Sequence, residues 1–175
     1  MCLPISVGIG KDASGYSLDV SGSVNVSGAL TRQVAILSYS QYGLGTAISI
    51  PSGTATTISF PYLFNYQGTA GITASGTNNT TFTNTSGQTL VVIVSYVIKW
   101  NSNSTGSRYS TILYNNSQRY GTNDVQACND YPEFGGTAVI VMSNNDYINI
   151  NCWQNSGSSI NIANSGETYV SFAVM

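Results

Sequence analysis

Acidic side chains are the residues of this chain best suited to chemistry, and three of its seven fall within ten positions. Asp124, Asp130 and Glu133 lie in the stretch NDVQACNDYPEFGG. A pair of carboxylates can act as acid and as base or nucleophile in glycoside hydrolysis. The same stretch has the composition of a loop, and Asp130 near Pro132 is typical of a residue that caps a turn. We interpret these acids as solvated loop residues and keep a catalytic pair as the alternative.

Other catalytic and metal-binding residue types are scarce. The sequence has no histidine, which removes the commonest metal ligand and neutral-pH base. It has no G-x-S-x-G motif, and the glycine-rich GIGKDASG lacks the spacing of a phosphate-binding loop. Asp146 could bind a cation together with a loop carbonyl, but its place after Ser-Asn-Asn favours a turn cap. We therefore expect no enzymatic activity, no cofactor and no metal.

The three cysteines are Cys2, Cys128 and Cys152. Their spacing matches neither a disulfide framework nor a metal finger. Cys128 and Cys152 could form a disulfide if their strands adjoin, whereas buried or half-buried free thiols are the favoured alternative.

Charged residues make up only 7% of the chain, although its hydrophobic fraction of 42% is ordinary. The five Lys and Arg residues cannot form the cationic clusters that neutralise phosphates, so a nucleic-acid surface is excluded. The longest apolar run, Leu90 to Val94, is too short to span a bilayer. The N-terminus MCLPISVGIGKD does not have the pattern of a signal peptide. We expect a folded domain with a neutral surface and no membrane insertion, carried outside a cell in an assembled particle.

The elements that must position these residues are strands. Runs rich in Val, Ile, Thr and aromatic residues alternate with polar turn segments, and no helix-length pattern occurs. The runs cover residues 47–50, 56–60, 71–75, 89–100, 109–114, 137–142, 146–153, 159–163 and 168–174. This spacing predicts an all-β sandwich or jelly roll.

The first thirty residues differ from the rest. In GYSLDVSGSVNVSGAL, apolar and polar residues alternate through two short strands broken by Ser-Gly-Ser. A lone hairpin of this length is marginal in water, so we expect it to pack against copies of itself or another protein. Residues 1–32 are thus predicted as an attachment or neck segment and residues 33–175 as the head domain. The expected attachment residues are Tyr16, Leu18, Val20, Val24 and Val26.

The order of features after residue 80 resembles the C1q/TNF-like jelly roll. The matching landmarks are FTNTSGQTLVVIVSYVIKW, TGSRYSTILYNNSQRYG, TAVIVMSNNDYININCWQNSGSSINI and TYVSFAVM. The resemblance implies a ten-stranded sandwich and a homotrimer with aromatic and aliphatic side chains along the threefold axis. The chain shows no collagen-like stalk and no counterpart of the acidic clusters that bind calcium in some members.

The resemblance and the aromatic composition together predict residues that line the trimer axis or a partner interface. Arg108 and Arg119 stand beside tyrosines, as at many interfaces, although they could equally be rim groups that keep a strand edge soluble. Trp100 and Trp153 end apolar strands, which favours core or axis packing over a platform for sugars. The predicted set is Tyr96, Trp100, Arg108, Tyr114, Arg119, Tyr120, Trp153 and Phe172.

A second resemblance comes from ASGYSLDVSGSVNVSGAL. It is similar to a motif of virion fibres, tail spikes and capsid-associated proteins, where a Y-x-L-D-V-x-G strand precedes a C-terminal head. We therefore expect a non-enzymatic virion structural protein, a trimeric minor capsid or fibre-head component on the capsid surface. Its expected partners are its own copies, capsid or fibre proteins and host-surface glycans. The alternatives are a carbohydrate- or protein-binding module of a bacterial cell or spore surface, and a spike enzyme using the acids at 124–133.

Overall fold

The computed structural model describes residues 38–67, 71–163 and 166–175. These residues form thirteen strands in two large sheets and one small sheet. The predicted attachment segment, with Tyr16, Leu18, Val20, Val24 and Val26, lies outside the described residues. The described residues contain no helix that could cross a membrane.

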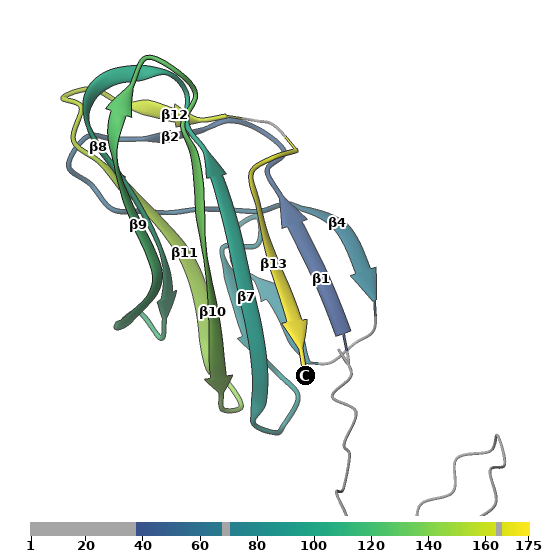
Figure 1. Cartoon of the computed structure of the whole chain (residues 1–175). Helices are drawn as coiled ribbons and strands as arrows, with labels where there is room; N and C mark the ends of the chain where they lie inside the picture. Colours follow the sequence, from purple (N-terminus) through teal and green to yellow (C-terminus); the bar gives the residue numbers. More distant parts are fainter. Residues whose placement is uncertain (1–37, 68–70, 164–165) are drawn as a thin grey trace, which may run out of the picture. The chain divides into compact units, whose positions relative to one another are not determined.

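Five strands form the first large sheet, here called sheet I, and they lie side by side across Figure 1. In spatial order they are β10 (Glu133–Met142), β7 (Leu90–Lys99), β13 (Tyr169–Val174), β1 (Ser38–Gly43) and β4 (Tyr62–Gln67). All neighbours pair antiparallel, and β7 pairs with β10 along ten consecutive positions.

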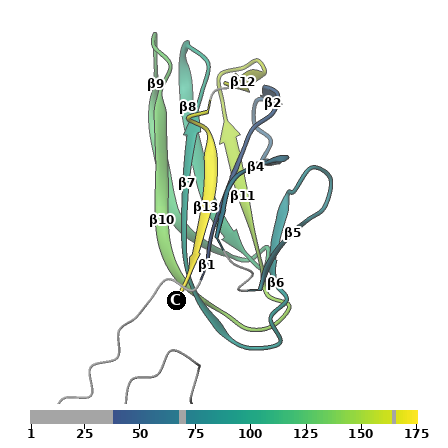
Figure 2. The same cartoon turned by 90° about the vertical axis from the view of Figure 1, so that its right-hand side faces the viewer.

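Six strands form the second large sheet, sheet II. Its main path runs β5 (Ile72–Ser75), β6 (Thr81–Asn84), β11 (Tyr147–Gln154), β8 (Asn103–Tyr114) and β9 (Gln118–Cys128), and β3 (Thr56–Thr57) pairs with β11. The small sheet joins β2 (Ile48–Ile50) to β12 (Ile160–Ile162). In Figure 2, β10 and β13 lie on one side of the sandwich and β5 and β6 on the other.

The alternation of side chains explains how the two sheets meet. In β7, Val92, Val94, Tyr96 and Ile98 are buried, whereas the residues between them are half-buried on the opposite face. The inward side chains form one core with an aromatic centre, where the ring centroids of Phe82 and Phe172 are 4.5 Å apart. The all-β jelly-roll prediction is therefore confirmed.

Several strands differ from the sequence-based expectation. The stretch NSNSTGS, expected as a turn, contributes residues 103–107 to β8, with a register shift between Asn103 and Ser107. The polar segment 118–128 forms β9, so Asp124 lies in a strand and not in a loop. β1, β4 and β6 were also not expected. β9 pairs antiparallel with β8, and β4 pairs antiparallel with β1. This pairing stabilises β9 and β4 although their own sequences lack a clear alternating pattern.

Candidate assembly surface and binding pockets

Four of the eight predicted interface residues are wrong, because they lie inside the subunit. Tyr96 and Phe172 are 1% exposed, and Trp100 and Arg108 are 0% exposed. A side chain without exposed surface cannot contact a second chain. Tyr96 donates a hydrogen bond to the Gly121 carbonyl at 2.7 Å, and the Trp100 ring stacks on Phe134 at 6.4 Å between centroids. These residues hold the two sheets together.

Arg108 is buried by an arrangement of backbone carbonyls at the start of β8. Its Nη1 donates to the Thr105 carbonyl at 2.9 Å, and its Nη2 donates to the Asn103 carbonyl at 3.0 Å. The guanidinium carbon lies 5.9 Å from the centroid of the Trp100 ring. Burial lowers the pKa of Arg108 from its ordinary value. Arg108 therefore stabilises the irregular start of β8 and is not an interface residue.

The other four predicted residues, Tyr114, Arg119, Tyr120 and Trp153, keep exposed surface on β8, β9 and β11. Tyr114 and Tyr120 pack edge to face, with ring centroids 6.3 Å apart. The Arg119 guanidinium lies over the Tyr109 ring at 5.7 Å. All four belong to sheet II, so the structure does not unite the predicted set on one surface. Their role at an interface stays a prediction.

The predicted acids and the two cysteines of the head domain do not form one site. All three acids are exposed: Asp124 lies within β9, Asp130 in the following turn and Glu133 at the start of β10. Cys128 and Cys152 are free thiols, the first exposed and the second buried, and burial raises the pKa of the Cys152 thiol. Within the described ranges, no group of three or more His, Cys, Asp and Glu residues is placed to hold a metal ion.

Asp146 caps the turn, as the sequence predicts. Its Oδ2 accepts from the Ser143 amide at 2.7 Å, and its Oδ1 accepts from Asn115 Nδ2 at 2.8 Å. The Tyr114 hydroxyl also donates to Asp146 Oδ2. The hydrogen bond from Tyr114, followed by that from Asn115, lowers the pKa of Asp146. Burial and the neighbouring Asp146 raise the pKa of Tyr114 to about 12.

The outer face of sheet I carries apolar side chains at both of its edges and one row of polar side chains across its width. Val139 and Val141 on the edge strand β10 are 61% and 60% exposed. They pair in register with Ile93 and Val91 of β7, whose side chains share this face. We call this surface the sheet I face and define it by Tyr39, Tyr62, Phe64, Val91, Ile93, Val97, Val139, Val141, Tyr169 and Ala173.

At the opposite edge, every residue of β4 is exposed. The large side chains Tyr62, Leu63, Phe64 and Tyr66 are 46–56% exposed. A Cβ atom on Gly43 would lie 1.9 Å from the Phe64 ring, and one on Gly45 would lie 1.8 Å from the Tyr62 ring. The two glycines thus let these rings lie over the loop end of β1, on the sheet I face. In the sequence this edge corresponds to the uncharged run YLFNY. Its apolar and polar residues do not alternate, so the sequence does not predict it as a strand.

The sheet I face carries almost no charge. The only charged residues in its five strands are Lys99 and Glu133, which pair in register at one end of β7 and β10. Lys99 also forms an ion pair with Glu167. Polar side chains on the face bond to one another: Ser95 and Thr137 are 2.9 Å apart, and Asn65 donates to Gln41 at 3.1 Å. Such a surface can be covered by another protein at little desolvation cost.

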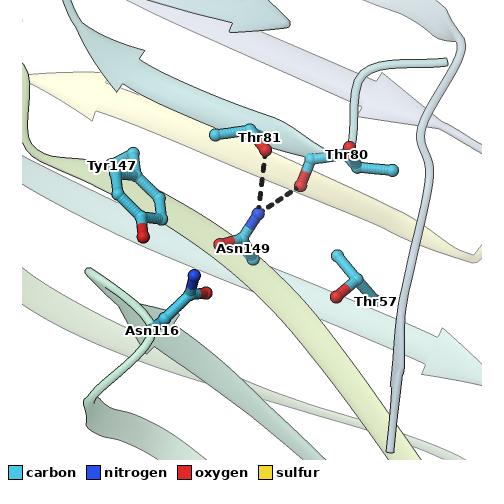
Figure 3. Close-up of a pocket in the computed structure, with 6 residues that line it drawn as sticks. All are labelled: Thr57, Thr80, Thr81, Asn116, Tyr147 and Asn149. Carbon is cyan, nitrogen blue, oxygen red and sulfur yellow. Dashed lines mark hydrogen bonds between the residues drawn. The ribbon is translucent and has the colours of Figure 1, made fainter. Parts of the chain in front are cut away.

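The outer face of sheet II is polar and bears a pocket. Figure 3 shows its lining, Thr57, Thr80, Thr81, Asn116, Tyr147 and Asn149. Asn149 is 6% exposed, and its Nδ2 donates to the Thr80 carbonyl at 2.8 Å and to Thr81 Oγ1 at 3.0 Å. The Oδ1 atom of Asn149 is buried and accepts no hydrogen bond from the described residues.

A second pocket adjoins the first and shares Asn116 with it. Tyr109, Arg119 and Trp153 contribute to its lining. The two pockets follow the outward residues of β11, which alternate Tyr147, Asn149, Asn151 and Trp153. The sequence signal for this surface was the alternation of asparagines and aromatics in YININCW, which was interpreted only as a strand.

No family model matches the chain, and no curated protein is significantly similar to it in sequence. Solved structures do match. Murine APRIL is similar with a TM-score of 0.62 and 12% identity over 79% of this chain and 98% of that one. The Eiger TNF of S. frugiperda is similar with a TM-score of 0.52 and 10% identity, over 78% and 91% of the two chains. Vertex protein P5 of PRD1 is similar with a TM-score of 0.58 and 17% identity, over 80% and 98%.

At these identities the likeness establishes the fold. The chain has a TNF-like jelly roll, as the order of its sequence landmarks predicts.

Proposed function

We propose that the chain is a non-enzymatic virion structural protein whose head domain assembles as a homotrimer through the sheet I face. The observation that carries this proposal is the nearly uncharged outer face of sheet I, which exposes Val139 and Val141 on β10 at one edge and Tyr62 and Phe64 on β4 at the other. Exposed apolar side chains gathered on one face mark interaction sites.

The geometry of this face favours a ring over a twofold dimer. Its two edges differ, with small aliphatic side chains on β10 and large aromatic ones on β4. Contact between two different edges is heterologous, and repeated contacts of that kind close into a ring when the rotation allows it. Three copies are the number implied by the C1q/TNF-like fold. Burying about 2,000 Å² or more of such surface makes the assembly obligate.

A role on a virion is supported by three features together. The vertex protein of PRD1 shares the fold. The N-terminal segment ASGYSLDVSGSVNVSGAL resembles motifs that precede heads in virion fibres. The low charge of the chain suits a displayed, weakly adhesive surface. In this proposal, residues 1–32 bind capsid or fibre proteins, and the head is displayed on the capsid surface.

The virion role is tested with particles assembled in the presence of the full chain or of a chain lacking residues 1–32. We expect the full chain to co-sediment with particles and the shortened chain to remain in the supernatant. A chain of the same length in which Tyr16, Leu18 and Val20 are replaced by Ser separates loss of the side chains from loss of length. Equal incorporation of all three chains would contradict the proposed role of the segment.

A carbohydrate- or protein-binding module of a bacterial cell or spore surface is the second candidate function. The polar pockets on the outer face of sheet II favour it. The two candidates differ in the particle experiment, because a surface module of a bacterium has no reason to co-sediment with virions.

A further inference from the structure

We infer that the Asn149 pocket is a binding site for a neutral saccharide, with Asn149, Tyr147 and Asn116 as its main contacts. The inference deepens the proposed display function and rests on it, because a sugar site serves attachment only if sheet II faces outward in the assembly. Trimer contacts through the sheet I face leave sheet II on the outside, since the two sheets form opposite layers of the sandwich.

Asn149 shows that the pocket requires a hydrogen-bond donor. Its Nδ2 is held by the Thr80 carbonyl and Thr81 Oγ1, so the orientation of the amide is fixed. Its Oδ1 is buried beside the pocket and lacks a donor among the described residues. In Figure 3 this oxygen lies on the side of Tyr147 and Asn116, away from Thr80 and Thr81. A buried acceptor without a partner destabilises a protein, and a ligand hydroxyl that donates to it removes that cost.

The other lining residues select the chemistry of the ligand. None of the six is charged, so the pocket offers nothing to compensate an ionic ligand. Thr57 donates its own proton to Asn151 Oδ1 at 2.9 Å, which leaves its oxygen as an acceptor. The Asn116 side chain supplies both a donor and an acceptor. Adjacent hydroxyls of a pyranose can satisfy this mixture, and the half-exposed ring of Tyr147 can pack against the apolar face of the sugar.

The walls of the pocket are held in place before a ligand arrives. Asn115 and Asn116 occupy the left-handed region, with φ of 48° and 55°, in the tight turn between β8 and β9. Asn115 Oδ1 accepts from the Tyr147 amide at 2.9 Å, so the turn is tied to the start of β11. A preformed site loses less entropy on binding, which allows useful affinity from few contacts.

The adjoining pocket extends the site to a second sugar unit. It meets the first at Asn116 and is lined in part by Trp153 and Tyr109, whose rings can contact another pyranose. The site therefore fits a disaccharide better than a monosaccharide. Its ligand chemistry is that of an uncharged glycan, whether on a host cell or in a bacterial surface polysaccharide.

The test is titration of the full chain with methyl glycosides of neutral hexoses and N-acetylhexosamines, followed by NMR. Matching disaccharides and the methyl glycoside of sialic acid complete the panel. We expect at least one neutral glycoside to bind with a Kd on the order of 1 mM. We expect its disaccharide to bind more tightly and the sialoside not to compete. Binding by the sialoside alone, or by no sugar at roughly ten times that concentration, would overturn the inference.

Variants locate the binding. Tyr147→Ser and Asn149→Leu are expected to weaken binding at least tenfold. Asn149→Leu also removes two hydrogen bonds that stabilise the fold. Thr57→Val is therefore the second polar variant, because it keeps the shape of an exposed side chain. We expect it to weaken binding threefold to tenfold. Ser75→Ala, exposed on β5 and outside both pockets, is the matched control and should bind as the unmodified chain does. Unchanged affinity in Tyr147→Ser and Thr57→Val would place the sugar elsewhere and refute the site.

The mass of the sample in solution, measured alongside, separates this inference from the assembly proposal. A trimer that binds no sugar refutes only the saccharide site. A monomer that binds sugar through Tyr147 refutes only the assembly.

Discussion

At the scale of single residues, the buried Arg108 shows how local geometry overrides the usual place of a side chain. Its guanidinium bonds to the Asn103 and Thr105 carbonyls and lies near Trp100, and no carboxylate of the described residues bonds to it. We predict that Arg108→Met destabilises the protein by about 3 kcal/mol, because these carbonyls lose their donors inside the subunit. Urea denaturation measures the change.

Arg119→Met is the matched control for this prediction. Arg119 is exposed on β9, so its replacement should change the free energy of unfolding by no more than about 0.5 kcal/mol. If Arg108→Met were as stable as the unmodified chain, the cost of burying the charge would equal the gain from its hydrogen bonds.

The turn cap at Asp146 makes stability depend on pH. Hydrogen bonds from Tyr114 and Asn115 lower the pKa of Asp146 in the folded state, so the folded state binds the proton less tightly than the unfolded chain does. The stabilisation is fully present above the unfolded pKa of about 4 and is lost as the pH falls through the lower folded value. We predict that Asp146→Asn is less stable than the unmodified chain at pH 7, and that the difference shrinks below pH 4.

Urea midpoints recorded from pH 7 to pH 2 test this prediction. A difference between the two chains that stays constant over the whole range would show that the charge of Asp146 does not stabilise the cap. Asp130→Asn, in the exposed turn after β9, controls for a general effect of removing an acid.

The two kinds of residue differ in how far the sequence predicts them. The Asp146 cap follows from a local pattern, Ser-Asn-Asn-Asp before a strand, and is confirmed. The burial of Arg108 depends on the register shift that brings the carbonyls of residues 103–107 around the guanidinium. No local pattern announces that shift. The Asn149 pocket likewise depends on β6, which the sequence does not reveal as a strand.

At the scale of elements, the sandwich closes where β9 of sheet II meets β10 of sheet I. Glycines allow this approach: a Cβ atom on Gly136 would lie 2.0 Å from the Gly121 carbonyl oxygen, which accepts the Tyr96 hydroxyl. Asn123 also donates across the gap to the Gly135 carbonyl. We predict that Gly136→Ala destabilises the protein by about 2 kcal/mol or more, because β9 must move away from β10.

Thermal or urea unfolding measures this effect, with Gly166→Ala as the control. A Cβ atom on Gly166 would contact nothing, so this replacement should be close to neutral. A neutral result for Gly136→Ala would mean that the two strands separate without loss of packing.

The strands with strong alternation or continuous β-branched runs, β7, β10, β11 and β13, are predicted from the sequence alone. β9 is missed because its Gln, Asn, Asp and Thr residues have low strand propensity and it forms by pairing with β8. β4 is missed because its apolar residues are all exposed and therefore show no alternation. Tertiary pairing, not local preference, determines these two elements.

At the scale of the whole molecule, the order of strand landmarks predicts the TNF-like jelly roll, and the structure confirms it. The sequence did not reveal which residues lie at the surface, because β7 is apolar on both of its faces. Tyr96 of β7 and Trp100 directly after it therefore look like interface residues in the sequence. The structure buries both in the core, and the sheet I face contains Ile93 and Val97.

The sheet I face makes a prediction for assembly. Val139→Asp is expected to weaken the trimer at least about 30-fold at each interface, because a desolvated central side chain contributes about 2 kcal/mol. Phe64→Asp on the opposite edge should have a similar effect. Tyr131→Asp removes a comparably exposed apolar side chain from the turn between β9 and β10 and is the control. Sedimentation velocity over a range of concentrations measures all three.

The mass of the full chain at micromolar concentration, from sedimentation equilibrium, tests the central claim most directly. The account predicts a species of three times the 18.5-kDa subunit mass. A chain that stays a single subunit over the whole concentration range would contradict it, because the apolar sheet I face would then be stable in water without a partner.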